Sequence, residues 1–348
     1  MELDPRKREI LRIVIDSYIA TGEPVGSKSV APRMKKPCSS ATIRNEMSDL
    51  EEMGLLEHPH TSAGRVPTLS GYRMYVDSLM EHYTLSFEET LLLNSLLSDK
   101  AREAGEILED MNRLLAKMTG CAIASFTRQS CGTIERFDGV YINERAFLLV
   151  LVTSAGRAIT RHFPVSFPLT PERLRFLIRV LDGHLAKKEL GGVTMERMLA
   201  LEKDLGEFRG VIPPLIQIIY DVMAEMGEVA VSVYGLANLL SFPEFQGEEA
   251  AKIVGQLEDT DALLERFGRE IPSHLQVHIG QGGGGLDGAG SVICPFRLKN
   301  GLQGAVCVIG PKRMNYAEIV SRLQYLAKEI HAVHGFEPSL PLIEKKDQ

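Results

Sequence analysis

The side chains best suited to chemistry lie in one short segment near the start of the chain. Asn45 can form two hydrogen bonds with adenine, and Arg44 can form two with guanine, at base edges in the major groove of DNA. The helical period of about 100° per residue puts Asn45 on one face with two small residues, Ala41 and Ser48. Thr42 and Arg44 flank that face, and the opposite face is apolar, with Ile43, Met47 and Leu50. The segment predicts a helix that packs with one side and enters the major groove with the other.

Charge is segregated in this region, although the whole protein has a net charge of −7. No acid occurs from Pro24 to Asn45, where the basic residues are Lys28, Arg33, Lys35, Lys36 and Arg44. Residues 46–57 then hold five acids and no base, and residues 58–76 are again free of acids. Because the N-terminal turns of a recognition helix meet the bases, acids at its other end point away from the duplex. The pattern predicts a local positive patch for DNA.

Three helices and a hairpin are predicted to position these side chains. Helix-start signals place the first helix after Asp4, the second at Ser27 and the third after Ser39 or Ser40. A hairpin over residues 55–68 follows, with Gly64 near its tip. This order is typical of a winged helix-turn-helix. A winged helix that binds protein, or a polar helix face that is merely solvated, remains the alternative.

The rest of the chain alternates between helix and strand patterns. Strands are predicted in two regions, 121–164 and 275–309, and a helical block separates them. We expect the two regions to form one antiparallel sheet, with the helical block as an insertion. The fold class is therefore α+β with several domains.

One helix has more apolar surface than a thin surface helix needs, directly after Pro213 and Pro214. The expected contact with a second chain consists of Leu215, Ile216, Ile219, Val222, Met223 and Met226. Simple packing into the protein's own core is the equal alternative.

Other chemistry finds little support. Gly280, Gly282 and Gly285 match a dinucleotide-binding pattern, but Ser291–Phe296 after them reads as a strand and not as the required helix. His58 and His60 lack nearby metal-ligand partners. No nucleophile–base or carboxylate pair stands out, so neither an enzyme, a metal site nor a cofactor is expected. The five cysteines have no metal or disulfide spacing and are expected to be free thiols.

The longest apolar run, Ala146–Val152, is far shorter than the roughly 18–20 residues that span a bilayer. The chain also lacks the pattern of a signal peptide. We therefore expect a soluble, cytoplasmic protein with no membrane partner.

Four strings carry a family resemblance: "GEPVGSKSVA", "SSATIRNEMSDLEEMGLLEHPHTSAGRVPTLSGYRMYVD", "GLANLLSFPEF" and "IGPKRMNYAEIVSRLQYLAKEI". They resemble the HrcA family of heat-inducible transcription repressors, and the similarity extends from about Leu3 to about Ile330. The resemblance implies a homodimeric repressor of chaperone operons that binds double-stranded DNA at an inverted repeat called CIRCE. It also implies dependence on a GroE-type chaperonin.

The resemblance further implies domains and site residues. The expected domains are a winged helix-turn-helix at 1–83, a GAF-like domain at 84–165 and 250–338, a dimerisation domain inserted at 166–249, and a frayed tail at 339–348. The DNA contacts that it implies are Ser39, Ser40, Ala41, Thr42, Arg44 and Asn45, with Thr61, Ser62, Gly64 and Arg65 in the wing. To these we add Ser27, Lys28 and Ser48 as expected contacts. The loop after Gly280 departs from the family pattern, because Gln281 and a glycine-rich run stand where an acidic or amide pair is expected.

GAF-like domains often bind small ligands, which leaves a repressor gated by a metabolite as the alternative function. No convergent set of polar residues within 121–164 or 275–309 supports that alternative.

Overall fold

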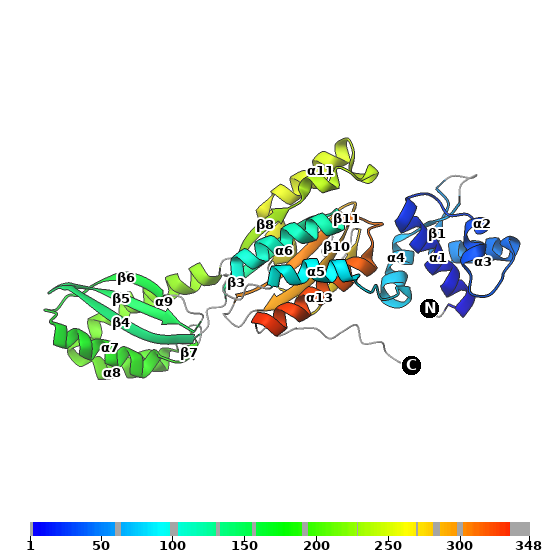
Figure 1. Ribbon diagram of the computed structural model, residues 1–348. Coiled ribbons are helices and arrows are strands. Elements are labelled where there is room, and N and C mark those ends of the chain that lie inside the picture. Colours follow the sequence, from blue (N-terminus) through cyan, green and yellow to red (C-terminus); the bar gives the residue numbers. More distant parts are fainter. Residues whose placement is uncertain are drawn as a thin grey trace.

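The computed structural model describes residues 3–59, 64–97, 104–129, 133–154, 158–189, 194–227, 229–268, 271–280, 286–297 and 302–334. Three parts follow one another in space (Figure 1). The head comprises residues 3–79, the core domain is built around a five-stranded sheet, and the outer domain comprises residues 133–227. The head and the outer domain lie at opposite ends of the core domain (Figure 1).

The head has the predicted order of helices and hairpin. Asp4 begins the first helix because its carboxylate accepts hydrogen bonds from the backbone N–H groups of Arg6 and Lys7, at 2.9 and 3.0 Å. Gly22 ends that helix in the left-handed conformation. The elements are α1 (Pro5–Thr21), α2 (Ser27–Val30), α3 (Ser40–Glu52), β1 (Leu56–Glu57), β2 (Val66–Pro67) and α4 (Leu69–Met74). β1 and β2 pair antiparallel, so the predicted hairpin is confirmed.

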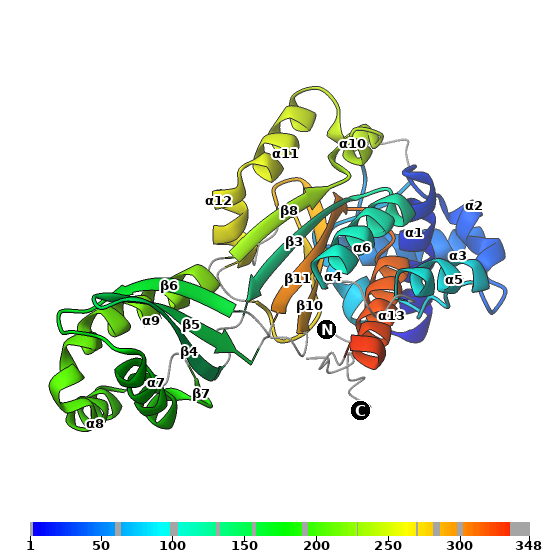
Figure 2. The ribbon, with the colours of Figure 1, turned by 60° about the vertical axis from the view of Figure 1, so that its left-hand side comes forward.

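The core domain has an antiparallel sheet in the order β8-β3-β11-β10-β9. Helices cover both faces of the sheet (Figure 2). The strands are β3 (Ala122–Gln129), β8 (Val229–Tyr234), β9 (Gln276–Ile279), β10 (Ala289–Arg297) and β11 (Leu302–Pro311). The helices are α5 (Phe87–Leu97), α6 (Ala104–Thr119) and α13 (Tyr316–His334) on one face, and α10 (Leu236–Leu239), α11 (Glu248–Glu258) and α12 (Thr260–Leu263) on the other.

Strand β11 shows why the strands of this sheet have long apolar runs in their sequences. Val306 and Val308 belong to the hydrophobic cluster that also contains residues of α5, α6 and α13. The alternate residues Ala305 and Cys307 belong to the cluster on the opposite face. Because both faces are buried, residues 305–309 of the strand are apolar at every position.

The outer domain has a second antiparallel sheet, in the order β6-β5-β4-β7, and three helices. Its elements are β4 (Thr133–Asn143), β5 (Ala146–Thr153), β6 (Ala158–Pro164), α7 (Pro171–Leu185), β7 (Lys188–Glu189), α8 (Met195–Leu205) and α9 (Ile212–Gly227). Phe147 and Phe163 stack on the inner face of the sheet, with ring centroids 4.8 Å apart. All three helices contribute to the hydrophobic cluster on that same face.

The prediction of one sheet from residues 121–164 and 275–309 is wrong. Only β3 of the first region pairs with β11, while β4, β5 and β6 form the sheet of the outer domain. The outer domain is inserted between β3 and β8 of the core domain. These two strands are neighbours in the core sheet and pair along Ile123–Arg128. The expected divisions after residues 165 and 249 therefore do not follow the sheets: β4–β6 join α7–α9, and β8 joins the core domain.

The apolar stripe of α9 is buried within its own chain. Leu215 and Val222 are fully buried and Ile219 is 4% exposed, all within the core of the outer domain. Ile216 is half-buried against the same core. The expectation that this stripe contacts a second chain is therefore wrong for these positions. The side chains of Met223 and Met226 lie outside the described residues.

Cys38, Cys121, Cys294 and Cys307 are free. Among the described helices, none combines the length and the apolar character that a membrane span requires. The expected frayed tail at 339–348 lies outside the described residues.

Candidate nucleic-acid interface

Helix α3 lies at the surface of the head with its apolar side inward. Ser39 caps it, since its Oγ accepts a hydrogen bond from the backbone N–H of Thr42 at 3.1 Å. The buried residues of α3 are those that the helical period predicts, namely Ile43, Met47 and Leu50. The cap determines where the helix begins, and the buried stripe determines which side faces solvent.

The opposite face of α3 is open. Ala41, Arg44 and Asn45 are exposed, and Thr42 and Ser48 are half-buried beside them. Ser39 is exposed and Ser40 half-buried where the helix begins. Within the described part of the chain, the side chains of Arg44 and Asn45 have no hydrogen-bond partner. An amide and a guanidinium at the N-terminal turns of an open helix are free to bind base edges.

Two acids of α3, Glu46 and Asp49, are paired with cations of the first helix. The Lys7 ammonium lies 2.9 Å from a Glu46 carboxylate oxygen and 3.0 Å from an Asp49 carboxylate oxygen. The hydrogen bond to Glu46, followed by the one to Asp49, raises the pKa of Lys7. Arg6 also pairs with Glu46, at 3.3 Å. Lys7 was not among the predicted site residues, because nothing in the sequence around it indicates which helix its charge faces.

Several cations around α3 have no carboxylate partner among the described residues, namely Lys28, Lys35, Lys36 and Arg44. Lys28 lies on α2, directly after the half-buried Ser27, and Lys35 and Lys36 lie in the loop before α3. The backbone N–H of Lys35 donates to a Glu9 carboxylate oxygen at 2.6 Å, which ties this loop to α1. These exposed charges match the phosphate contacts that orient a protein on a duplex.

The stem of the wing packs against the segment between α1 and α2. The backbone N–H groups of Val25 and Arg65 each donate to the other residue's carbonyl at 2.9 Å. A Cβ on Gly64 would come within 2.4 Å of the Val25 carbonyl oxygen, so only glycine permits this approach. The expected wing contacts Thr61 and Ser62 lie outside the described residues.

The side chain of Arg65 turns inward. Its Nη2 lies 2.8 Å from a Glu51 carboxylate oxygen, and its Nη1 contacts Nδ1 of His58. The Arg65 side chain is only 13% exposed. The sequence predicts a phosphate contact for Arg65, whereas the structure gives its guanidinium a partner at the end of α3. Nothing in the sequence around Arg65 indicates that it pairs with Glu51.

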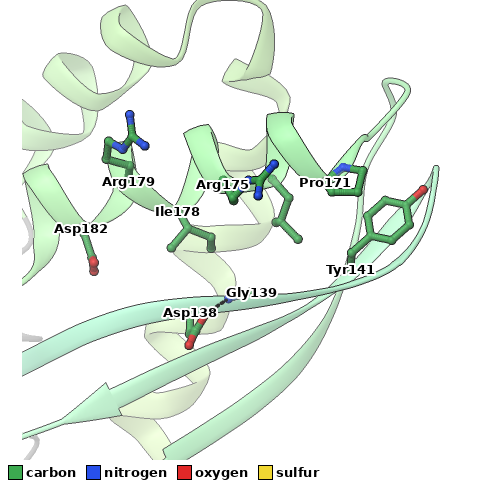
Figure 3. A pocket seen from close by; sticks show the side chains of 9 residues that line it. Asp138, Gly139, Tyr141, Pro171, Arg175, Ile178, Arg179 and Asp182 are labelled. Atoms are coloured by element: carbon green, nitrogen blue, oxygen red, sulfur yellow. Dashed lines mark hydrogen bonds between the residues drawn. The ribbon is translucent and has the colours of Figure 1, made fainter.

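The core domain and the outer domain each contain a cavity among the described residues. An apolar hollow in the core domain, bordered by Leu108, Cys294 and Phe296, has a volume of about 20 Å³. A larger cleft of about 480 Å³ lies between β4 and α7 of the outer domain (Figure 3). Arg175 and Arg179 line its helix side and Gly139 its strand side (Figure 3). A hollow of about 20 Å³ has no room for a metabolite.

The glycine-rich segment ends in a strand. Gly280 has a left-handed conformation after β9, and β10 follows from Ala289. The predicted strand after this segment is therefore confirmed, and no helix N-terminus stands there to hold a pyrophosphate. Gly282 and Gly285 lie outside the described residues.

Two protein-family models match this chain and together cover most of it. Residues 2–79 match the family described as "Winged helix-turn-helix transcription repressor, HrcA DNA-binding", and residues 105–320 match "HrcA protein C terminal domain".

The "Heat-inducible transcription repressor HrcA" of Moorella thermoacetica is 36% identical over 335 residues, covering 94% of this chain and 96% of its own. The protein of the same description from Desulforudis audaxviator is 33% identical over 345 residues, covering 96% and 98%.

A crystal structure described as a hypothetical protein has a similar fold. It superposes with a TM-score of 0.55 at 21% identity, and the match covers 95% of this chain and 98% of that one.

Proposed function

Because the chain belongs to the HrcA family of heat-inducible transcription repressors, we propose that it represses chaperone operons by binding a CIRCE-type inverted repeat as a homodimer. The observation that carries this proposal is the contrast between the two halves of α3. Its N-terminal half exposes Arg44 and Asn45, whereas Lys7 pairs with Glu46 and Asp49 farther along the helix, and Arg65 pairs with Glu51. Such a helix can bring base-reading side chains into the major groove without placing unpaired carboxylates against phosphates.

The roles of the individual contacts follow from their positions. Arg44 and Asn45 read base edges, with Ala41, Thr42 and Ser48 giving the helix a slim profile in the groove. Ser27 and Lys28 at the start of α2, and Ser39 and Ser40 at the start of α3, contact the phosphate backbone, as do Thr61 and Ser62 in the wing. Gly64 permits the wing stem to approach Val25, and Arg65 holds that stem against α3.

A homodimer is supported by the uncovered face of the outer domain's sheet. The helices of this domain all pack on one face, so the apolar side chains on the other face are not covered by any described helix of the domain. Val140 and Ile142 of β4 are 55% and 48% exposed, and Leu148 opposite Val140 is half-buried. The half-buried Val150 and Val152 follow on β5, opposite Asp138 and Arg136. We assign this face, in place of the α9 stripe, to a second copy of the chain, because an inverted repeat calls for a two-fold dimer and a two-fold contact uses the same patch twice.

The dimer contact is tested by placing one charge on each side of the outer domain. Val150→Asp is expected to give a folded monomer that binds an inverted repeat weakly, because it buries an unpaired carboxylate in the proposed contact. Leu199→Asp is the matched control, since Leu199 of α8 is also apolar and is 59% exposed on the helical side. Sedimentation measures the mass. A monomer from Leu199→Asp and a dimer from Val150→Asp would move the contact to the helices.

Dependence on a GroE-type chaperonin is supported by the connectivity of the core sheet. Ile123 of β3 pairs with Tyr234 of β8 and with Val308 of β11, so the sheet closes only after most of the chain has been made. Strand pairing over such separations is slow and leaves apolar edges exposed meanwhile, which favours chaperonin binding. Under heat stress, unfolded proteins would occupy the chaperonin and the pool of active repressor would fall.

Two experiments test the proposal as a whole. DNase footprinting upstream of the organism's own chaperone operons should protect an inverted repeat. Gel shifts with freshly refolded protein should show a larger DNA-binding fraction when GroE-type chaperonin and ATP are added, and excess unfolded client protein should cancel the gain. If chaperonin leaves the DNA-binding fraction unchanged and a small molecule changes it, the result would support the metabolite-gated alternative instead.

A further inference from the structure

The head is held against the core domain by contacts around Arg313, in the turn between β11 and α13. Its Nη1 donates to the carbonyl oxygen of Ile19 in the last turn of α1, at 3.5 Å. Its Nη2 donates to a Glu244 carboxylate oxygen at 3.3 Å, and its Nε pairs with the other oxygen. Glu244 belongs to the core domain, so one guanidinium joins the end of α1 to two segments of that domain.

The end of α1 is shaped for this contact. Gly22 has φ of +72°, and a Cβ there would lie 3.2 Å from the guanidinium carbon of Arg313. The glycine therefore ends the helix and lets the guanidinium lie against the backbone. A cation at a helix C-terminus is also favoured by the helix dipole.

Helix α4 forms a second, apolar contact between the same two parts. The ring of Tyr72 meets the ring of Tyr316 edge-on, with centroids 6.4 Å apart, and both side chains are buried. Leu69 lies against the backbone of Gly280 at the end of β9. One hydrophobic cluster thus runs from the head into the core domain without a break.

The segment that leaves the head is held as well. Arg322 of α13 donates from Nη2 to a Glu89 carboxylate oxygen at 2.6 Å, and its guanidinium lies over the ring of Tyr83. The Tyr83 hydroxyl donates to the other Glu89 oxygen at 2.9 Å. Reorienting the head would break the contact of α1 with Arg313, the buried ring contact of α4 and the contacts of Tyr83 in this connecting segment.

We infer that this junction determines the half-site spacing that the repressor accepts, an inference that rests on the proposed dimeric DNA binding. The head and the outer domain stand at opposite ends of the core domain (Figure 1). In a dimer joined through the outer domains, the distance and angle between the two α3 helices are set by the path through the Arg313 junction. A rigid junction pre-organises one spacing, whereas a loose one would let the heads adapt to several.

The test compares spacer lengths at the footprinted inverted repeat. Arg313→Ala and Glu244→Gln loosen the junction without touching α3, and Arg113→Ala is the matched control, because Arg113 forms a surface ion pair with Glu109 inside α6. Adding about five base pairs to the spacer turns one half-site by about half a helical turn. We expect this to weaken binding about 100-fold for the unchanged protein and for Arg113→Ala, but only about 10-fold or less for the junction variants. Affinity for a single half-site should stay within about twofold for all of them.

The other possible outcomes are equally decisive. Junction variants that keep the spacing preference of the unchanged protein would overturn the inference, and so would variants that lose half-site affinity along with it. An unchanged protein that binds all spacers equally well would overturn the inference and leave the proposed function standing. An unchanged protein that binds neither the half-site nor the repeat would instead overturn the proposed function.

Discussion

Replacing Arg65 by alanine distinguishes a structural wing stem from a phosphate contact. The Arg65 guanidinium pairs with Glu51 at 2.8 Å and contacts His58, and its side chain is 13% exposed. If this geometry persists on DNA, the charge of Arg65 is already neutralised and displaces no counterion. We therefore expect Arg65→Ala to lower the stability of the head and to leave the salt dependence of DNA binding unchanged.

The magnitude follows from the ion pair that the substitution removes. A hydrogen bond to a charged group contributes about 1.5–3 kcal/mol. Glu51 is 32% exposed and can turn to water once its partner is gone, so we expect a decrease of about 1–2 kcal/mol in the free energy of unfolding. Lys36→Ala is the matched control. Lys36 is exposed without a carboxylate partner among the described residues, and removing one phosphate contact should reduce the slope of log K against log salt by about 0.9.

The assay is fluorescence anisotropy with operator DNA from about 50 to about 200 mM salt, together with urea unfolding of each variant. Arg65→Ala should show a lower unfolding midpoint and the salt slope of the unchanged protein. Lys36→Ala should show the unfolding midpoint of the unchanged protein and a reduced salt slope. A slope reduced by about one unit in Arg65→Ala would refute the reasoning, because the guanidinium must then leave Glu51 and bind a phosphate.

Three further predictions concern base readout, acid stability and the outer domain. Asn45→Ala should cost about 1–3 kcal/mol of specific binding in gel shifts, with non-specific binding and the unfolding midpoint unchanged, because the side chain is exposed and free. Burial works to raise the pKa of Glu89, but the backbone N–H of Ser86, Arg322 and the Tyr83 hydroxyl together lower it to about 2. The resulting stabilisation, at most about 3 kcal/mol, is complete above the ordinary pKa of about 4.5 and is lost as pH falls toward 2. Acid unfolding curves of Arg322→Met should show a smaller step, because the hydrogen bonds from Ser86 and Tyr83 to Glu89 remain. Ile219→Asp should unfold the outer domain, as followed by circular dichroism, and a folded product would contradict its burial in the core.

Local features of this protein could be predicted from its sequence because they depend on neighbouring residues. Asp4 and Ser39 cap helices through side chains that bond to backbone groups two or three residues ahead. The spacing of Ile43, Met47 and Leu50 sets the buried side of α3, and with it the face that carries Arg44 and Asn45. The family strings and the order of three helices and a hairpin were likewise enough for the winged helix.

Only the tertiary structure decided which distant residues meet. An apolar strand such as β3 carries no mark of its partner, so its pairing with β8 and β11 instead of β4 could not be predicted. The stripe of α9 looks the same whether it packs on its own domain or on a second chain. The charge of Arg65 suits a phosphate as well as Glu51, and the distance between the wing stem and the end of α3 makes Glu51 its partner. These outcomes depend on long-range geometry, which the order of residues along the chain determines only through the complete fold.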